Sequence, residues 1–76
     1  MDAITRETLL SYGNGMSLPS NGSTVVGRGR YAVSVRTENG EYVVAFYKDG
    51  HEHTPGVTYD SASDMLQDVR GWLGVE

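Results

Sequence analysis

The stretch 30–48, RYAVSVRTENGEYVVAFYK, decides the fold, because it contains two alternating apolar runs joined by Asn39-Gly40. Asn-Gly is a strong short-range hairpin signal, since both residues tolerate the positive φ angles of a two-residue turn. The pattern therefore predicts an antiparallel pair of strands at 30–37 and 42–48.

The register of this hairpin sorts its side chains onto two faces. Directly opposed residues share a face, so the turn sets Glu38 against Glu41, a mild like-charge repulsion. The expected core face holds Tyr31, Val33, Val35, Tyr42, Val44 and Phe46. The second face holds Ala32, Ser34, Arg36, Val43, Ala45 and Tyr47. Because it is too apolar for full exposure, either an N-terminal helix covers it or it is a partner or dimer surface.

The segments after the first hairpin extend the sheet and end in a helix. Asp49-Gly50 is a second turn signal before a strand at 51–54, which Pro55 ends or confines to a sheet edge. Ser61 and Gly74 are expected to cap a C-terminal amphipathic helix. Its apolar face is formed by Ala62, Met65, Leu66, Val69, Trp72 and Leu73.

The segments before the hairpin predict a short helix, a loop and a first strand. Residues 3–12 favour a helix capped by Asp2 and Gly13, and 24–27 favours a strand. Residues 13–23 have the Gly, Asn and Ser content of a flexible loop, which Met16 and Leu18 pin to the core. The expected fold is α+β: helix, antiparallel meander of three to four strands, helix.

Length and composition narrow the classes of function. The 76 residues fit a single domain, 1–76, with a small core and no visible signal peptide or apolar run of membrane-spanning length. The chain has no cysteine, which excludes disulfides and thiolate metal sites. Its net charge of −4 disfavours direct nucleic-acid binding and suits a basic protein partner or simple solubility.

Catalytic and metal-binding patterns are weak. His51 and His53 point to one face of the expected strand, but a zinc site needs further ligands, so a polar hairpin is the favoured interpretation. We expect no enzyme activity and no cofactor, because so small a domain lacks depth for a water-excluding pocket. The stretch 27–30, Gly-Arg-Gly-Arg, predicts a bulge or bend with solvated arginines.

Acidic residues form the more suggestive pattern. Asp60, Asp64 and Asp68 recur every four residues, which predicts a line along one edge of the C-terminal helix. The helix dipole accounts for Asp60 and Asp64 but leaves Asp68 unexplained. Together with glutamates at the turns, these residues predict either a solvated face or an acidic flank that imitates nucleic-acid phosphates.

The layout resembles a known family. The stretch 59–66, YDSASDML, opens the last helix with a D-S-x-x-x-L pattern, and Trp72 lies near the helix end. Over residues 30–74 this resembles small phage-encoded type I anti-CRISPR proteins. The resemblance implies a phage protein, acting in the host cytoplasm, that binds a CRISPR effector complex and blocks DNA recognition without catalysis.

We therefore predict a non-catalytic inhibitor that occludes the basic DNA-contact surface of a protein complex, as a monomer or homodimer. The candidate contact residues are Asp60, Asp64, Asp68, Glu38 and Glu41, with Arg36 and Tyr47 as possible anchors. One alternative is a structural or assembly domain that self-associates through the apolar second face. A more distant one is a metal-dependent hydrolase centred on His51 and His53.

Overall fold

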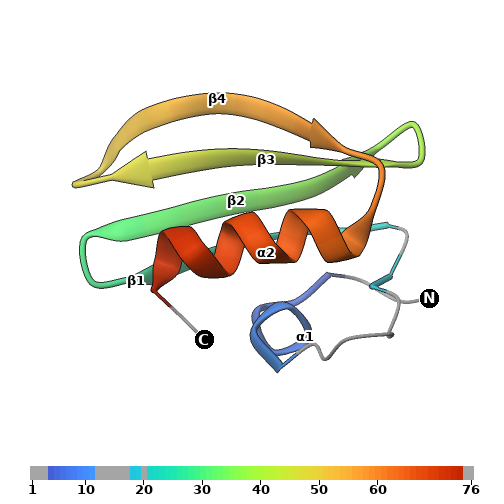
Figure 1. Cartoon of the computed structure of the whole chain (residues 1–76), viewed down its shortest axis with the longest axis horizontal. Coiled ribbons are helices and arrows are strands. Elements are labelled where there is room, and N and C mark those ends of the chain that lie inside the picture. Colours follow the sequence, from blue (N-terminus) through green and yellow to red (C-terminus); the bar gives the residue numbers. More distant parts are fainter. Residues whose placement is uncertain (1–3, 12–17, 20, 75–76) are drawn as a thin grey trace.

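The computed structural model describes residues 4–11, 18–19 and 21–74, and its elements follow the expected α+β order (Figure 1). Four antiparallel strands form one sheet in the order β1-β2-β3-β4, with a helix before it and a helix after it. The elements are α1 (Arg6–Ser11), β1 (Ser23–Arg28), β2 (Tyr31–Glu38), β3 (Glu41–Lys48), β4 (His51–Tyr59) and α2 (Ala62–Leu73).

The central hairpin has the register predicted from its turn. Val35 pairs with Val44 and Val33 with Phe46, and Asn39 and Gly40 have φ angles of 52° and 80°. The Asp49-Gly50 turn is also confirmed, since both residues have positive φ. These local signals succeed because the turn residues and the apolar alternation require the same pairing.

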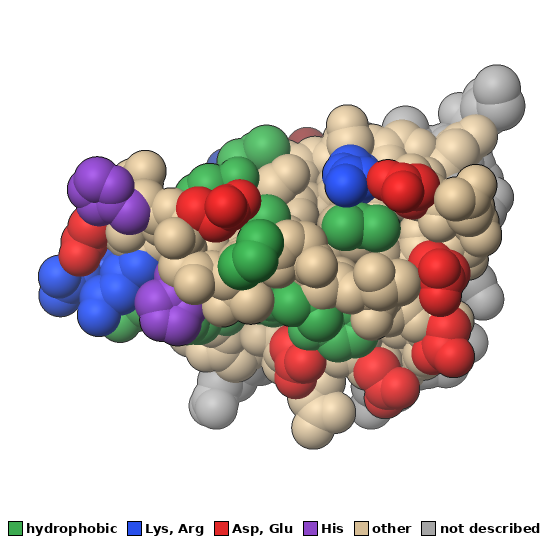
Figure 2. Space-filling model, turned by 90° about the horizontal axis from the view of Figure 1, so that it is seen from above, with side chains coloured by type: hydrophobic (Ala, Val, Ile, Leu, Met, Phe, Trp, Pro, Cys, Tyr) green, Lys and Arg blue, Asp and Glu red, His purple; other side chains and the backbone are tan. Residues whose placement is uncertain are grey.

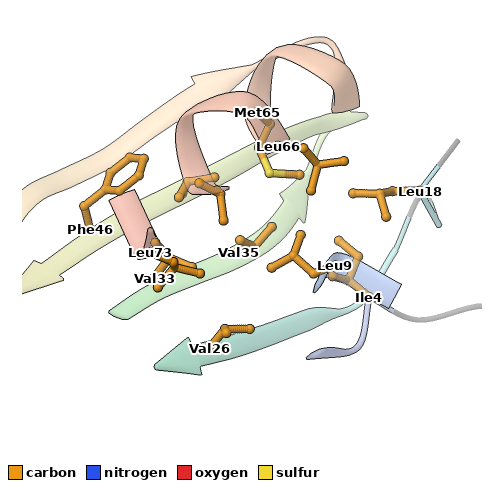
Figure 3. Packing of buried hydrophobic residues seen from close by; sticks show 12 residues of the cluster. Ile4, Leu9, Leu18, Val26, Val33, Val35, Phe46, Met65, Leu66 and Leu73 are labelled. Carbon is orange, nitrogen blue, oxygen red and sulfur yellow. The ribbon is translucent and has the colours of Figure 1, made fainter. Parts of the chain in front are cut away.

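One face of the sheet carries the core (Figure 3). Val33, Val35 and Val44 are fully buried beneath α2, which contributes Met65, Leu66, Val69 and Leu73. The indole Nε1 of Trp72, near the end of α2, donates to the carbonyl oxygens of Ala32 and Tyr47, at 3.2 and 3.0 Å. The predicted packing of the C-terminal helix on this face is confirmed.

The N-terminal helix joins the same face, so one alternative for the second face is wrong. Ile4 and Leu9 are 1% exposed and belong to the cluster that contains Val26 and Val35. Leu18 is buried beside them, as expected. Within the described residues, the second sheet face is therefore covered by neither helix.

Several element boundaries differ from the prediction. α1 begins at Arg6, where Thr5 Oγ1 accepts a hydrogen bond from the Thr8 N–H at 3.1 Å, and it ends at Ser11. Asp2, Gly13 and Met16 lie outside the described residues. β4 runs through Pro55 to Tyr59 as an edge strand, with an irregular register between Val44 and Tyr47 of β3.

Candidate functional site

The β2–β3 turn and the start of α2 lie at the same end of the molecule (Figure 1). Glu38 and Glu41 face each other across the turn. Tyr42 pairs with Tyr59, so Asp60 follows directly beside the first residue of β3. We call this surface the acidic end; it is formed by Glu38, Glu41, Asp60, Asp64 and Asp68, all of which are exposed.

The predicted line of Asp60, Asp64 and Asp68 along α2 is wrong for Asp60, because α2 begins after it. Ser61 is the N-cap, and its hydroxyl accepts a hydrogen bond from the Asp64 N–H at 3.4 Å. Asp60 therefore precedes the helix, and only Asp64 and Asp68 lie one turn apart on it. Asp64, in the first turn, faces the positive end of the helix dipole.

Two of these carboxylates have side-chain partners. Glu38 forms an ion pair with Arg36. Tyr59 donates its hydroxyl proton to Asp68 Oδ2 at 2.7 Å. Partial burial, reinforced by the hydrogen bond and the charge of Asp68, raises the pKa of Tyr59 to about 12. Asp68, which the helix dipole leaves unexplained, thus has a structural role.

The remaining carboxylates of the acidic end are unpaired. Within the part of the chain that the structure describes, Glu41, Asp60 and Asp64 have no side-chain partner. Figure 2 shows that most acidic side chains visible from this side lie toward one end of the molecule. This arrangement leaves unneutralised negative charge exposed to solvent.

The opposite end of the sheet is basic, and we call Arg28, Arg30 and Lys48 the basic end. Pairing of Arg28 with Tyr31, and of Tyr31 with Lys48, places all three beside the 29–30 and 49–50 turns. Histidine and basic side chains gather there in Figure 2.

Both arginines of the basic end are exposed to solvent, as predicted, and each also has hydrogen-bond partners within the fold. Arg28 donates to the carbonyl oxygens of Leu73 and Gly74 at the end of α2. Arg30 forms a bidentate pair with Asp49, with N–O distances of 3.0 and 2.8 Å. That hydrogen-bonded pairing lowers the pKa of Asp49 and raises the pKa of Arg30.

The sequence analysis expected a bulge or bend at 27–30 and did not identify a hairpin turn there. Gly29, with a φ of 63°, and Arg30 instead form a two-residue turn between β1 and β2. The available signal was a glycine placed between two strand-like runs. Once that turn is recognised, its arginines fall next to the Asp49-Gly50 turn.

The predicted anchors do not join the acidic end as a group. Tyr47 lies on the second sheet face near the other end of β3, about 20 Å along the strand from Glu41 at ~3.3 Å per residue. Arg36 lies on the same face but is engaged by Glu38. The structure therefore divides the predicted contact residues between two surfaces.

The second sheet face, which we call the open face, is apolar at its centre. Val25 is 69% exposed, and Ala32, Val43, Ala45 and Tyr47 are half-buried. A shallow hollow of about 330 Å³ is lined by Val25, Ala32, Ser34, Tyr47 and Gly50. This face offers contact area, whereas the acidic end offers charge.

Within the described residues, His51 and His53 do not belong to a metal-binding cluster. His53 packs against Trp72, with ring centroids 5.1 Å apart, and its Nδ1 lies 3.1 Å from Thr54 Oγ1. Among residues 4–11, 18–19 and 21–74, no group of three or more His, Asp or Glu side chains is placed to hold a metal ion.

No family model, curated protein sequence or solved structure matches this chain. Neither described helix is long and apolar enough to cross a membrane. The most distinctive surface feature of the described residues is the contrast between unpaired carboxylates at one end and the hydrogen-bonded Arg28 and Arg30 at the other.

Proposed function

We propose that this protein binds a basic protein surface through its acidic end and acts by occlusion, without catalysis. The observation that carries the proposal is the grouping of Glu41, Asp60 and Asp64 as exposed, unpaired carboxylates beside Glu38. Like charges at neighbouring positions repel one another, so this grouping lowers the stability of the free protein, and a basic partner would relieve the repulsion.

The target that fits this surface is a protein groove that normally holds nucleic-acid phosphates. Such grooves are lined with Lys and Arg, and their affinity comes largely from neutralising negative charge. Carboxylates on a rigid turn and a helix start can replace those phosphates without adding a nucleic acid. The resemblance to type I anti-CRISPR proteins makes a CRISPR effector complex in the host cytoplasm the first target to test.

Charge reversal tests this proposal directly. In the variant Glu41→Lys/Asp60→Lys/Asp64→Lys, affinity for a purified type I CRISPR effector complex should fall at least about tenfold, or ~1.4 kcal/mol. The loss should shrink as salt rises, because screening weakens both the native attraction and the new repulsion. Competition with target DNA should be lost in parallel.

A matched control separates local from net charge. Glu52 is exposed on β4 and pairs with Tyr47, near the basic end of the sheet. Glu52→Lys makes the same change in net charge as Asp64→Lys and should retain most of the binding that Asp64→Lys loses. Equal losses in the two single variants would assign binding to overall charge and reject the acidic end as a site.

The second candidate function is a structural domain that self-associates through the open face. The hollow beside Val25 and Tyr47, on a sheet face that carries neither described helix, favours it. Light scattering tests it, because assembly through this face predicts a mass that rises with concentration and that Tyr47→Glu abolishes. A constant mass would remove this candidate.

A further inference from the structure

β1 and β4 form the two edges of the sheet (Figure 1), and they differ in sequence and register. β4 carries Pro55, which has no N–H, and its pairing with β3 is irregular. Both features hinder the addition of another strand. β1 contains no proline and pairs with β2 in regular register from Ser23 to Arg28. The edge formed by β1 therefore lacks the protection that β4 has.

The outward-facing backbone groups of β1 follow from its turn. Arg28 and Tyr31 flank a two-residue turn, so they form a hydrogen-bonded pair, and such pairs recur at every second residue. Val26 and Thr24 thus bond to β2, as does Gly22, whose carbonyl accepts from the Thr37 N–H at 3.3 Å.

Alternate residues consequently direct their N–H and C=O groups away from the sheet: Ser23, Val25 and Gly27. Asn21 belongs to the same outward series, and its carbonyl accepts a hydrogen bond from the Ile4 N–H at 3.2 Å. The chain itself therefore occupies this edge at Asn21. Among the described residues, nothing pairs with the stretch from Ser23 to Gly27.

We propose that β1 pairs antiparallel with β1 of a second copy, about a two-fold axis at Val25. The open stretch is bounded by Asn21 and by the 29–30 turn, and Val25 is its midpoint. In this register Val25 of one copy lies opposite Val25 of the other, and Ser23 of each copy lies opposite Gly27 of the other. All outward groups are then paired, giving about six hydrogen bonds, whereas a shift of the axis by one residue loses some of them.

Side chains and charges fit this pairing. Val25, 69% exposed in the single chain, gains an apolar neighbour from the second copy. Because the strands are antiparallel, the basic end of one copy lies alongside the acidic end of the other. The four-stranded sheets join into one continuous sheet whose open faces lie on the same side. This interface is formed by the strand edge, so the proposal does not depend on binding by the acidic end.

The experiment measures mass and amide exchange together over a concentration series from about 20 μM to about 1 mM. We expect the mass to rise from 8.3 kDa toward twice that value. Hydrogen exchange at the Val25 amide should be fast at low concentration and slow at high concentration. Ser23 and Gly27 should follow, while Thr24 and Val26 should be protected throughout.

Two variants and one control identify the interface. Val25→Pro removes an outward N–H without removing a bond to β2, and Val25→Lys places like charges across the axis. Each should raise the dimer dissociation constant at least about tenfold with the fold intact by circular dichroism. Thr58→Lys, an exposed position on β4 with the same charge change as Val25→Lys, should leave it unchanged.

The proposal is overturned by any of three results. The mass stays at 8.3 kDa up to the highest concentration, or the Val25 amide is protected at every concentration, or the dimer persists in both Val25 variants. A dimer that persists in both Val25 variants but is lost in Tyr47→Glu would assign self-association to the open face instead.

Discussion

The basic end and the acidic end use charge in opposite ways. At the basic end, Arg28 binds the last carbonyls of α2, and Arg30 joins the 29–30 turn to the 49–50 turn through Asp49. At the acidic end, Glu41 and Asp64 have no side-chain partner in the described part of the chain. Charged groups at the basic end therefore hold parts of the fold together, whereas Glu41 and Asp64 at the acidic end leave their charge exposed to solvent.

The comparison yields a general expectation. Substitutions at the basic end should change the free energy of unfolding and leave binding intact, because its charged groups contact the protein itself. Substitutions of the unpaired carboxylates Glu41, Asp60 and Asp64 should change binding and shift the free energy of unfolding by no more than about 0.5 kcal/mol. Measuring both quantities on each variant tests the division between the two ends.

The largest effect on stability is expected at Trp72, which packs near the basic end. Its ring makes edge contacts with Tyr31 and Phe46, with centroids 5.2 and 5.6 Å away, and its indole N–H bonds to β2 and β3 carbonyls. Trp72→Ala should lower the free energy of unfolding by about 3–5 kcal/mol in urea titrations.

Trp72→Phe is the control, because it keeps most of the ring contacts and loses the N–H donor. It should cost less, about 1–2 kcal/mol. If Trp72→Ala unfolds at the same urea concentration as the parent, the packing of α2 on β2 and β3 is wrong.

Arg28→Ala should give the next largest effect. The guanidinium satisfies carbonyl groups at the end of α2 and complements the negative end of the helix dipole. Its removal should lower the free energy of unfolding by about 1 kcal/mol, measured by thermal and urea denaturation. Arg6→Ala is the matched control, since Arg6 is exposed on α1, and it should change stability by less than about 0.5 kcal/mol. Equal effects would mean that the α2 cap is not a stabilising contact.

The sequence predicted the fold better than it predicted the charge division, for a physical reason. The Asn39-Gly40 turn, the alternation around it and the Ser61 cap are local signals, and the structure confirms each. The hydrogen bond from Arg28 to the Leu73 carbonyl joins distant parts of the chain, so no local sequence pattern predicts it. Likewise, the grouping of Glu41 with Asp60 depends on the pairing of β3 with β4.

The Tyr59–Asp68 hydrogen bond predicts a loss of stability at alkaline pH. The folded-state pKa of about 12 exceeds the ordinary tyrosine value of about 10, so the folded state holds this proton more tightly. The resulting stabilisation is fully present below pH ~10 and is lost as pH rises toward ~12. Tyr59→Phe should therefore flatten the fall in stability over this range, measured by urea titration at several pH values.

Tyr47→Phe is the control for that measurement, because Tyr47 lies on the open face near the basic end of β3, away from Asp68. An absorbance titration of the tyrosines should show the highest-pH step disappearing in Tyr59→Phe alone. A parent protein whose tyrosines all titrate near pH 10 would contradict the contact with Asp68.

The smallest stability effect, and the one of opposite sign, is expected for Glu41→Lys. Glu41 faces Glu38 across the turn, and like charges in directly opposed positions destabilise a hairpin. Lysine at position 41 replaces that repulsion with attraction, so the free energy of unfolding should rise by about 0.2–0.5 kcal/mol. If the acidic end is a binding surface, the same variant should bind its basic target more weakly, most clearly at low salt. A residue that lowers stability while strengthening binding is placed for its partner and not for the fold. A variant that is less stable, or that binds as tightly as the parent, would assign Glu41 to the fold or to solvent and break the division between the two ends.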